Sequence, residues 1–136
     1  MDILRRNTDY ALRIMVALAS NWGKEEISTR VFSRQQDIPY QLACKLMQRL
    51  HKAKLVKSSR GPKGGFSLRR EPSEINLLEI IETIQGPMSI NRCLVDIAAC
   101  VRQSNCPVNK KLQGLQLYLE DFLKAITLEQ LLEDNG

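Results

Sequence analysis

Hydrophobic residues near the start of the chain recur with the spacing of helices that bury one face. Between residues 11 and 22 they follow the i, i+3, i+4, i+7 pattern, at Ala11, Ile14, Met15, Leu18, Ala19 and Trp22. Because Gly23 follows, the pattern predicts a first helix that ends there, with Trp22 in the core. Ser28 is a good N-cap and predicts a short second helix through about Gln35, with Val31 and Phe32 facing inward.

A third amphipathic helix is predicted from Asp37 as N-cap, with Pro39 in its first turn. Its apolar stripe consists of Leu42, Leu46, Met47, Leu50 and Ala53. Its opposite face carries Gln41, Cys44, Lys45, Gln48 and Lys52, with Tyr40 and Arg49 at the margins. A short helix, a tight turn and a helix with a polar, basic outer face indicate a helix-turn-helix motif whose second helix enters the DNA major groove.

Two short strand-like runs follow, at residues 55–58 and 66–69, and residues 60–65 join them. Pro62 and the glycines of this connection require a turn, so the segment predicts a two-stranded hairpin with a basic tip, or wing. A phosphate-binding loop is the alternative, but the Walker spacing and its GK[ST] ending are absent. The fold class predicted is mainly α, a winged helix-turn-helix with a two-stranded wing.

The second half of the chain predicts three further helices. Asn76 and Glu79 form a capping box for a helix that ends at Gly86, and Thr127 with Gln130 opens a short final helix. Between them a heptad stripe runs through Val108, Leu112, Leu115, Leu119, Phe122 and Ile126. This stripe favours a long C-terminal dimerisation helix, although it would also fit packing on its own domain. We expect three parts: residues 1–86 for DNA binding, a cysteine-containing loop at 87–107, and 108–136 for dimerisation.

Charge divides the 136 residues unevenly. Residues 1–70 contain 15 Lys and Arg against 5 Asp and Glu, whereas residues 71–136 contain 5 against 10. Residues 38–70 contain nine basic and no acidic residues, which favours nucleic acid as the partner of the first half. We find no stretch long and apolar enough to cross a membrane, no signal peptide and no catalytic constellation. We therefore expect a cytoplasmic protein that is not an enzyme and has no membrane partner.

Three of the four cysteines, Cys93, Cys100 and Cys106, lie within 14 residues. Their spacing is not the CxxC of a zinc finger, and three thiolates in a loop suit an iron-sulfur cluster with one position left for another side chain. Zinc, and plain buried or redox-active thiols, remain alternatives on spacing alone. The fourth, Cys44, falls on the DNA-facing side of the third helix, where a packing role is the simpler interpretation.

With these motifs the chain resembles the family of winged-helix iron-sulfur transcriptional regulators that includes IscR, NsrR and RirA. The resemblance covers nearly the whole chain. It depends on the three cysteines and on residues 8–13 (TDYALR), 60–66 (RGPKGGF), 77–81 (LLEII) and 126–129 (ITLE). It implies a homodimer that binds double-stranded DNA at a palindromic operator, with Arg60 of the wing in the minor groove.

The resemblance also bears on the metal ligands. IscR-like members carry a histidine three residues after the last cysteine, where this chain has Asn109, a poor iron ligand. NsrR-like members use an aspartate of the TDYxLR segment from the partner subunit, and Asp9 matches it. This match favours a [4Fe-4S] over a [2Fe-2S] cluster held by Cys93, Cys100, Cys106 and Asp9. The alternative for Asp9 is an acid that stabilises a helix N-terminus.

The sequence thus predicts a dimeric DNA-binding regulator whose operator affinity depends on an iron-sulfur cluster that senses redox state, nitric oxide or iron. The alternative is a cluster-free repressor of the same fold, controlled by thiol oxidation or by a protein or small-molecule partner. The expected DNA contacts are Ser28, Thr29, Tyr40, Gln41, Cys44, Lys45, Gln48, Arg49, Arg60 and Lys63.

Overall fold

The computed structural model describes residues 3–61, 64–90 and 107–134. Its elements are, in order, α1 (Arg6–Ser20), α2 (Thr29–Gln35), α3 (Tyr40–Lys52), β1 (Val56–Ser59), β2 (Gly65–Leu68), the 3₁₀ turn η1 (Pro72–Glu74), α4 (Leu77–Gln85), α5 (Pro107–Lys124) and α6 (Leu128–Asp134). The two strands pair antiparallel, with Val56 opposite Leu68. The prediction of a mainly helical fold with a two-stranded wing is confirmed.

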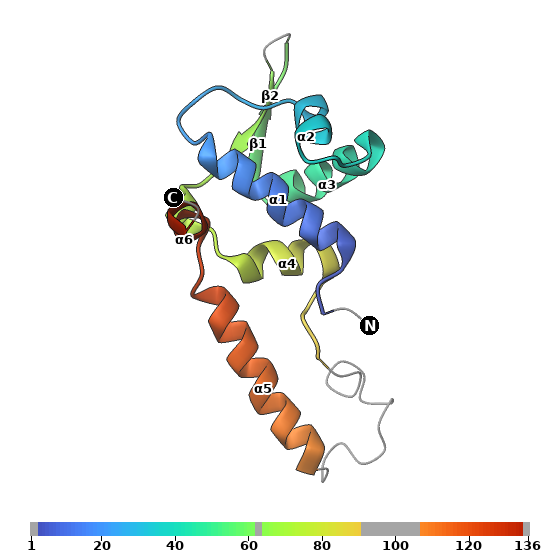
Figure 1. Ribbon diagram of the computed structural model, residues 1–136, viewed down its shortest axis with the longest axis vertical. Coiled ribbons are helices and arrows are strands. Elements are labelled where there is room, and N and C mark those ends of the chain that lie inside the picture. Colours follow the sequence, from blue (N-terminus) through green and yellow to red (C-terminus); the bar gives the residue numbers. More distant parts are fainter. Residues whose placement is uncertain (1–2, 62–63, 91–106, 135–136) are drawn as a thin grey trace.

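One hydrophobic core holds α1 to α4, the wing and α6 together, and we call these elements the head. Phe32 from α2, Leu50 from α3 and Ile80 from α4 are completely buried around Ile14 of α1. In Figure 1, α1 crosses the middle of the head, with α2 and α3 on one side and α4 below. The apolar stripes of the helices therefore define the head, as their periodicity predicts.

The predicted helix caps are largely confirmed. The Ser28 side chain accepts a hydrogen bond from Val31 N at 3.3 Å, and Asn76 accepts one from Glu79 N at 2.9 Å. Thr127 and Gln130 form a reciprocal capping box, with bonds of 3.1 and 3.3 Å. These local side-chain bonds satisfy backbone N–H groups that have no partner inside their helices.

Three local predictions are wrong. Asp37 does not cap α3, because its backbone is left-handed (φ 54°) and the helix begins after Pro39. Trp22 lies beyond the end of α1 and is 42% exposed. Val31 is 37% exposed, because the seven-residue α2 buries only Phe32 fully.

The end of the wing nearest its turn is fixed to the loop that precedes α2. Ile27 and Phe66 exchange two backbone hydrogen bonds of 2.9 and 2.8 Å, and the Ser59 hydroxyl donates to the Glu26 carboxylate at 2.6 Å. A Cβ on Gly65 would lie 2.6 Å from the Ile27 carbonyl oxygen, so glycine permits this close approach. Gly65 therefore allows the wing to pack against the loop before α2.

α5 and α6 differ in their relation to the head. Figure 1 shows α5 leading away from it, while α6 returns against α1. Backbone bonds of 3.0 Å join Leu77 N to Ile126 O and Leu128 N to Ile75 O, and Leu128 is completely buried. No helix within the described ranges has the length and apolar character needed to span a membrane.

Candidate DNA-binding surface

The outer face of α3 presents polar and basic side chains to solvent. Ala43, Leu46, Met47 and Leu50 are buried on its inner side. Gln41, Lys45 and Gln48 recur at spacings of four and three on the opposite side, and all three are exposed. Amide and ammonium groups on one exposed helix face are the groups that donate to base edges and phosphates.

The start of α3 is joined to α2 by an aromatic contact. The Arg30 guanidinium lies 5.0 Å from the centre of the Tyr40 ring, and Tyr40 is 44% exposed. The structure therefore brings a second cation to this end of the surface. Arg30 was not among the expected DNA contacts, although its position in the first helix of a helix-turn-helix was a usable signal.

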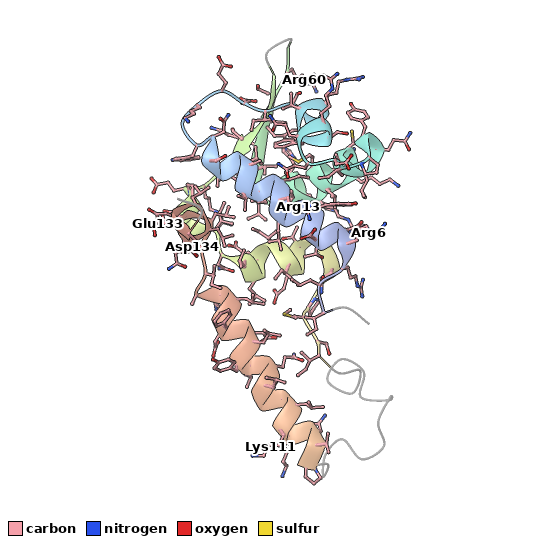
Figure 2. All side chains as sticks on the ribbon, in the orientation of Figure 1. Arg6, Arg13, Arg60, Lys111, Glu133 and Asp134 are labelled. Atoms are coloured by element: carbon pink, nitrogen blue, oxygen red, sulfur yellow. The ribbon has the colours of Figure 1, made fainter. Side chains whose placement is uncertain are left out.

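The wing adds Arg60, which follows β1 and is exposed. Figure 2 shows it at the wing end of the molecule, beside α2. Lys63, the other basic residue expected there, lies outside the described residues. Arg60 therefore adds an exposed cation from the wing to those of α2 and α3.

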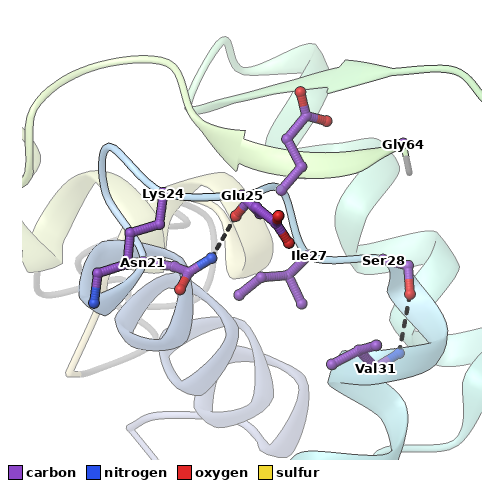
Figure 3. Close-up of a pocket in the computed structure, with 8 residues that line it drawn as sticks. Asn21, Lys24, Glu25, Ile27, Ser28, Val31 and Gly64 are labelled. Carbon is purple, nitrogen blue, oxygen red and sulfur yellow. Dashed lines mark hydrogen bonds between the residues drawn. The ribbon is translucent and has the colours of Figure 1, made fainter.

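Ser28 and Thr29, expected to contact DNA, lie at the start of α2. A hollow of about 550 Å³ adjoins Ser28, between the loop before α2 and the wing (Figure 3). Two acidic residues, Glu25 and Glu26, and one basic residue, Lys24, line this hollow, and Ser28 already caps α2. Carboxylates repel phosphate, so this end of α2 is less suited to DNA than α3.

Two expected contacts lie on the flanks of α3. The Arg49 Nη1 atom donates to the Ile84 carbonyl of α4 at 2.8 Å, so one N–H group of this exposed residue is bonded to the head. Cys44 is half-buried and has a free thiol. The structure therefore separates Arg49 and Cys44 from the central row of Gln41, Lys45 and Gln48.

Among the expected metal ligands, the structure describes Asp9 alone. Its carboxylate lies 3.1 Å from the Arg13 guanidinium, and both side chains are about half exposed. Cys93, Cys100 and Cys106 lie outside the described residues. Within the ranges that are described, no group of three His, Cys, Asp or Glu side chains is placed to hold a metal ion. Asn109, at the position of the IscR-like histidine, is buried.

α5 exposes an apolar stripe that no element of the described head covers. Val108, Leu115, Tyr118 and Phe122 share one face and are each more than half exposed. Leu112 and Leu119, also in the predicted heptad stripe, are only partly exposed and lie along one edge of it. The uncovered stripe is thus centred on Leu115, Tyr118 and Phe122, one side of the predicted heptad.

The helix-turn-helix, its wing and the basic outer face of α3 define a winged-helix DNA-binding protein. Comparison with known families identifies the particular family of winged-helix proteins. The family model for Rrf2, described as an iron-dependent transcriptional regulator, matches residues 4–134, and the chain belongs to this family. It is a DNA-binding transcriptional regulator.

Individual relatives agree with this assignment. IscR of Vibrio atlanticus is 30% identical over 126 residues, which cover 93% of this chain and 72% of that protein. CymR, the global cysteine regulator of B. subtilis, matches with a TM-score of 0.81 at 29% identity, over 96% of each chain. IscR of T. potens matches with a TM-score of 0.77 at 26% identity, over 98% of this chain and 88% of that one.

Proposed function

We propose that two copies of the chain bind a palindromic operator, each with α3 in the major groove and Arg60 in the adjacent minor groove. The observation that carries this proposal is the exposed row of Gln41, Lys45 and Gln48 above a fully packed core. Two recognition helices that are held about one DNA turn apart read both half-sites at once. Lys63 is an additional candidate for a phosphate contact at the wing tip.

The second copy is proposed to bind through α5. Leu115, Tyr118 and Phe122 are 53, 69 and 55% exposed, an unusual set of large side chains to leave in water on one helix face. Pairing of this face with the same face of a second copy would form an isologous twofold interface. That symmetry matches the palindrome of the proposed operator.

Operator affinity is proposed to depend on an iron-sulfur cluster, [4Fe-4S] rather than [2Fe-2S]. Cys93, Cys100 and Cys106 would supply three thiolates and Asp9 of the second copy the fourth ligand. Asp9 is suited to reach another chain because it is exposed, and Arg13 would have to release it. When bound, such a cluster supplies a centre that responds to oxygen, nitric oxide or iron supply.

In this proposal, the described helices connect the cysteine-containing segment, residues 91–106, to the DNA-binding surface. α4 ends before residues 91–106 and α5 begins after them, so the segment joins the head to the proposed dimer helix. A change in the separation of α4 and α5 would change the distance between the two α3 helices. Because both half-sites must fit together, a small change would alter affinity strongly.

A second candidate is a cluster-free regulator of the same fold, controlled by thiol oxidation or by a partner. It is favoured by the likeness to CymR, which is the global cysteine regulator of B. subtilis. Under this hypothesis the same three cysteines act as thiols. Asp9 then has no role beyond its ion pair with Arg13.

An anaerobic iron, sulfide and visible-absorption assay separates the two candidates. With a cluster, the protein purified without oxygen absorbs in the visible and contains iron and sulfide, and Cys100→Ser abolishes both signals. Cys44→Ser is the matched control and retains them, because Cys44 lies on α3. Asp9→Ala should retain a chromophore that is more sensitive to oxygen, since a hard carboxylate is a replaceable ligand on iron. A colourless, iron-free wild-type protein would favour thiol control.

A further inference from the structure

The last turn of α4 is a junction between the recognition helix and the N-terminal segment. The final four carbonyls of a helix have no partner within it, and a cation nearby also complements the helix dipole. In α4 the Ile84 carbonyl accepts the 2.8 Å bond from Arg49. Gly86 then ends the helix with φ 82°. Arg49 therefore joins the C-terminal half of α3 to the C-terminal end of α4.

The neighbouring residue, Gln85, connects this turn to the start of the chain. Its Oε1 atom accepts from the Thr8 hydroxyl at 2.6 Å and from Arg5 N at 3.2 Å, and its Nε2 atom donates to the Ile3 carbonyl at 2.9 Å. Thr8 is completely buried, so the bond between the two side chains is shielded from water. The last turn of α4 is thus held from both sides, by Arg49 and by Gln85.

The position of Arg49 on α3 fits this attachment better than a phosphate contact. Gln41, Lys45 and Gln48 point away from the core, whereas Arg49 lies at the margin of their face, next to α4. Together with Lys52, Ala53 and Thr83 it lines a hollow of about 250 Å³ between the two helices. The direction of its guanidinium is already set by the Ile84 carbonyl.

We infer that Arg49 is a positioning residue for DNA recognition. Its hydrogen bond to Ile84 sets the orientation of α3 relative to α4. It thereby sets how Gln41 and Gln48 reach the bases and how Lys45 reaches the phosphate backbone. Loss of this bond then lowers specific affinity more than non-specific affinity, because non-specific binding depends on phosphate charge alone. This inference rests on the proposed use of α3 as the recognition helix.

The test compares two variants that each remove one positive charge from α3. Arg49→Met and Lys45→Met are titrated with an operator duplex, recovered by selection from random sequences, and with an unrelated duplex at several salt concentrations. Temperatures stay well below the unfolding midpoint of each variant. For Arg49→Met we expect about tenfold weaker operator binding, unchanged non-specific binding and an unchanged log-log salt slope. For Lys45→Met the slope should become shallower by about 0.9.

An Arg49→Met slope that is shallower by about one, with operator and non-specific affinity reduced together, would show a phosphate contact and overturn the inference. If Arg49→Met does not fold, Arg49→Lys replaces it. A lysine keeps a phosphate contact but not the directed bond to Ile84, so a reduced specificity ratio supports positioning and an unchanged ratio contradicts it. A normal slope for Lys45→Met would instead refute the proposed α3 surface, and absence of operator binding by the wild type would refute both.

Discussion

α3 and α5 are both amphipathic helices, but they differ in what covers their apolar faces. In α3 the residues Leu46, Met47 and Leu50 are at most 2% exposed, because the rest of the head packs against them. In α5 Leu115 and Phe122 are more than half exposed, although they continue the predicted heptad stripe. The same periodicity thus describes one helix whose partner is in its own chain and one whose apolar face is left uncovered by the described residues.

The difference separates two tasks within one small protein. The head has a complete core and can present its polar outer face to DNA. No described element covers the exposed side of the long helix, which is the basis for our proposal that a second copy covers it. Variants in the two helices should therefore fail in different ways.

The largest expected effect follows from charges in the α5 stripe. Leu115→Glu combined with Phe122→Glu should give a folded monomer whose operator affinity is reduced at least about 100-fold, because joint engagement of two half-sites is lost. Sedimentation and operator titration measure the two quantities. Gln113→Glu, on the opposite side of the same helix, is the control and should remain dimeric. Unchanged dimerisation of the double variant would remove α5 from the interface.

A substitution in the core of the head should instead lower the stability of the folded protein. Leu50→Ala should lower the free energy of unfolding by about 2–5 kcal/mol, because it opens a cavity where the side chain is completely buried. Leu115→Ala should leave the stability of the monomeric head within about 0.5 kcal/mol of the wild type. Chemical denaturation at low protein concentration measures both. Equal destabilisation by the two variants would contradict the claim that the head covers the apolar face of α3 but not that of α5.

An intermediate effect is expected where the head holds its N-terminal segment. Gln85→Ala should destabilise by about 1–3 kcal/mol, since it leaves the buried Thr8 hydroxyl without its acceptor. Thr8→Val in the same background should recover part of that loss. Gln35→Ala, on an exposed position of α2, serves as the control. If Thr8→Val and Gln85→Ala are strictly additive in denaturation experiments, the two side chains are not coupled.

The smallest effect concerns the wing. Arg60→Ala should weaken operator binding and reduce the log-log salt slope by about 0.9, with dimerisation unchanged. Binding titrations across salt concentrations, with sedimentation of the free protein, distinguish it from the α5 variants. An unaltered slope would mean that the wing points away from DNA.

The sequence predicts most of the head because its signals are local. The caps at Ser28, Asn76 and Thr127 depend on residues three positions apart, and the wing follows from its turn residues. Trp22 was misplaced because helix ends are set by backbone capping, which apolar periodicity does not report. The errors in this region are therefore confined to boundaries and to one short helix.

The contacts that define the site were less accessible from the sequence. Arg49 and Ile84 are 35 positions apart, and Thr8 and Gln85 are 77 apart, so only the fold brings them together. The exposed row of Gln41, Lys45 and Gln48 on α3 could be predicted from the sequence, because helical periodicity alone determines it. The assignment of Asp9 as a ligand came from a resemblance, and its ion pair with Arg13 became visible only in the structure.

The most direct test of a dimer that reads DNA through α3 is selection of bound sequences from a pool of random duplexes. The proposed function predicts an inverted repeat whose half-sites are centred about 10 base pairs, or one helical turn, apart. The Leu115→Glu and Phe122→Glu double variant should select no such repeat. Recovery of a single unrepeated half-site by the wild-type protein, or of no sequence preference at all, would contradict this account.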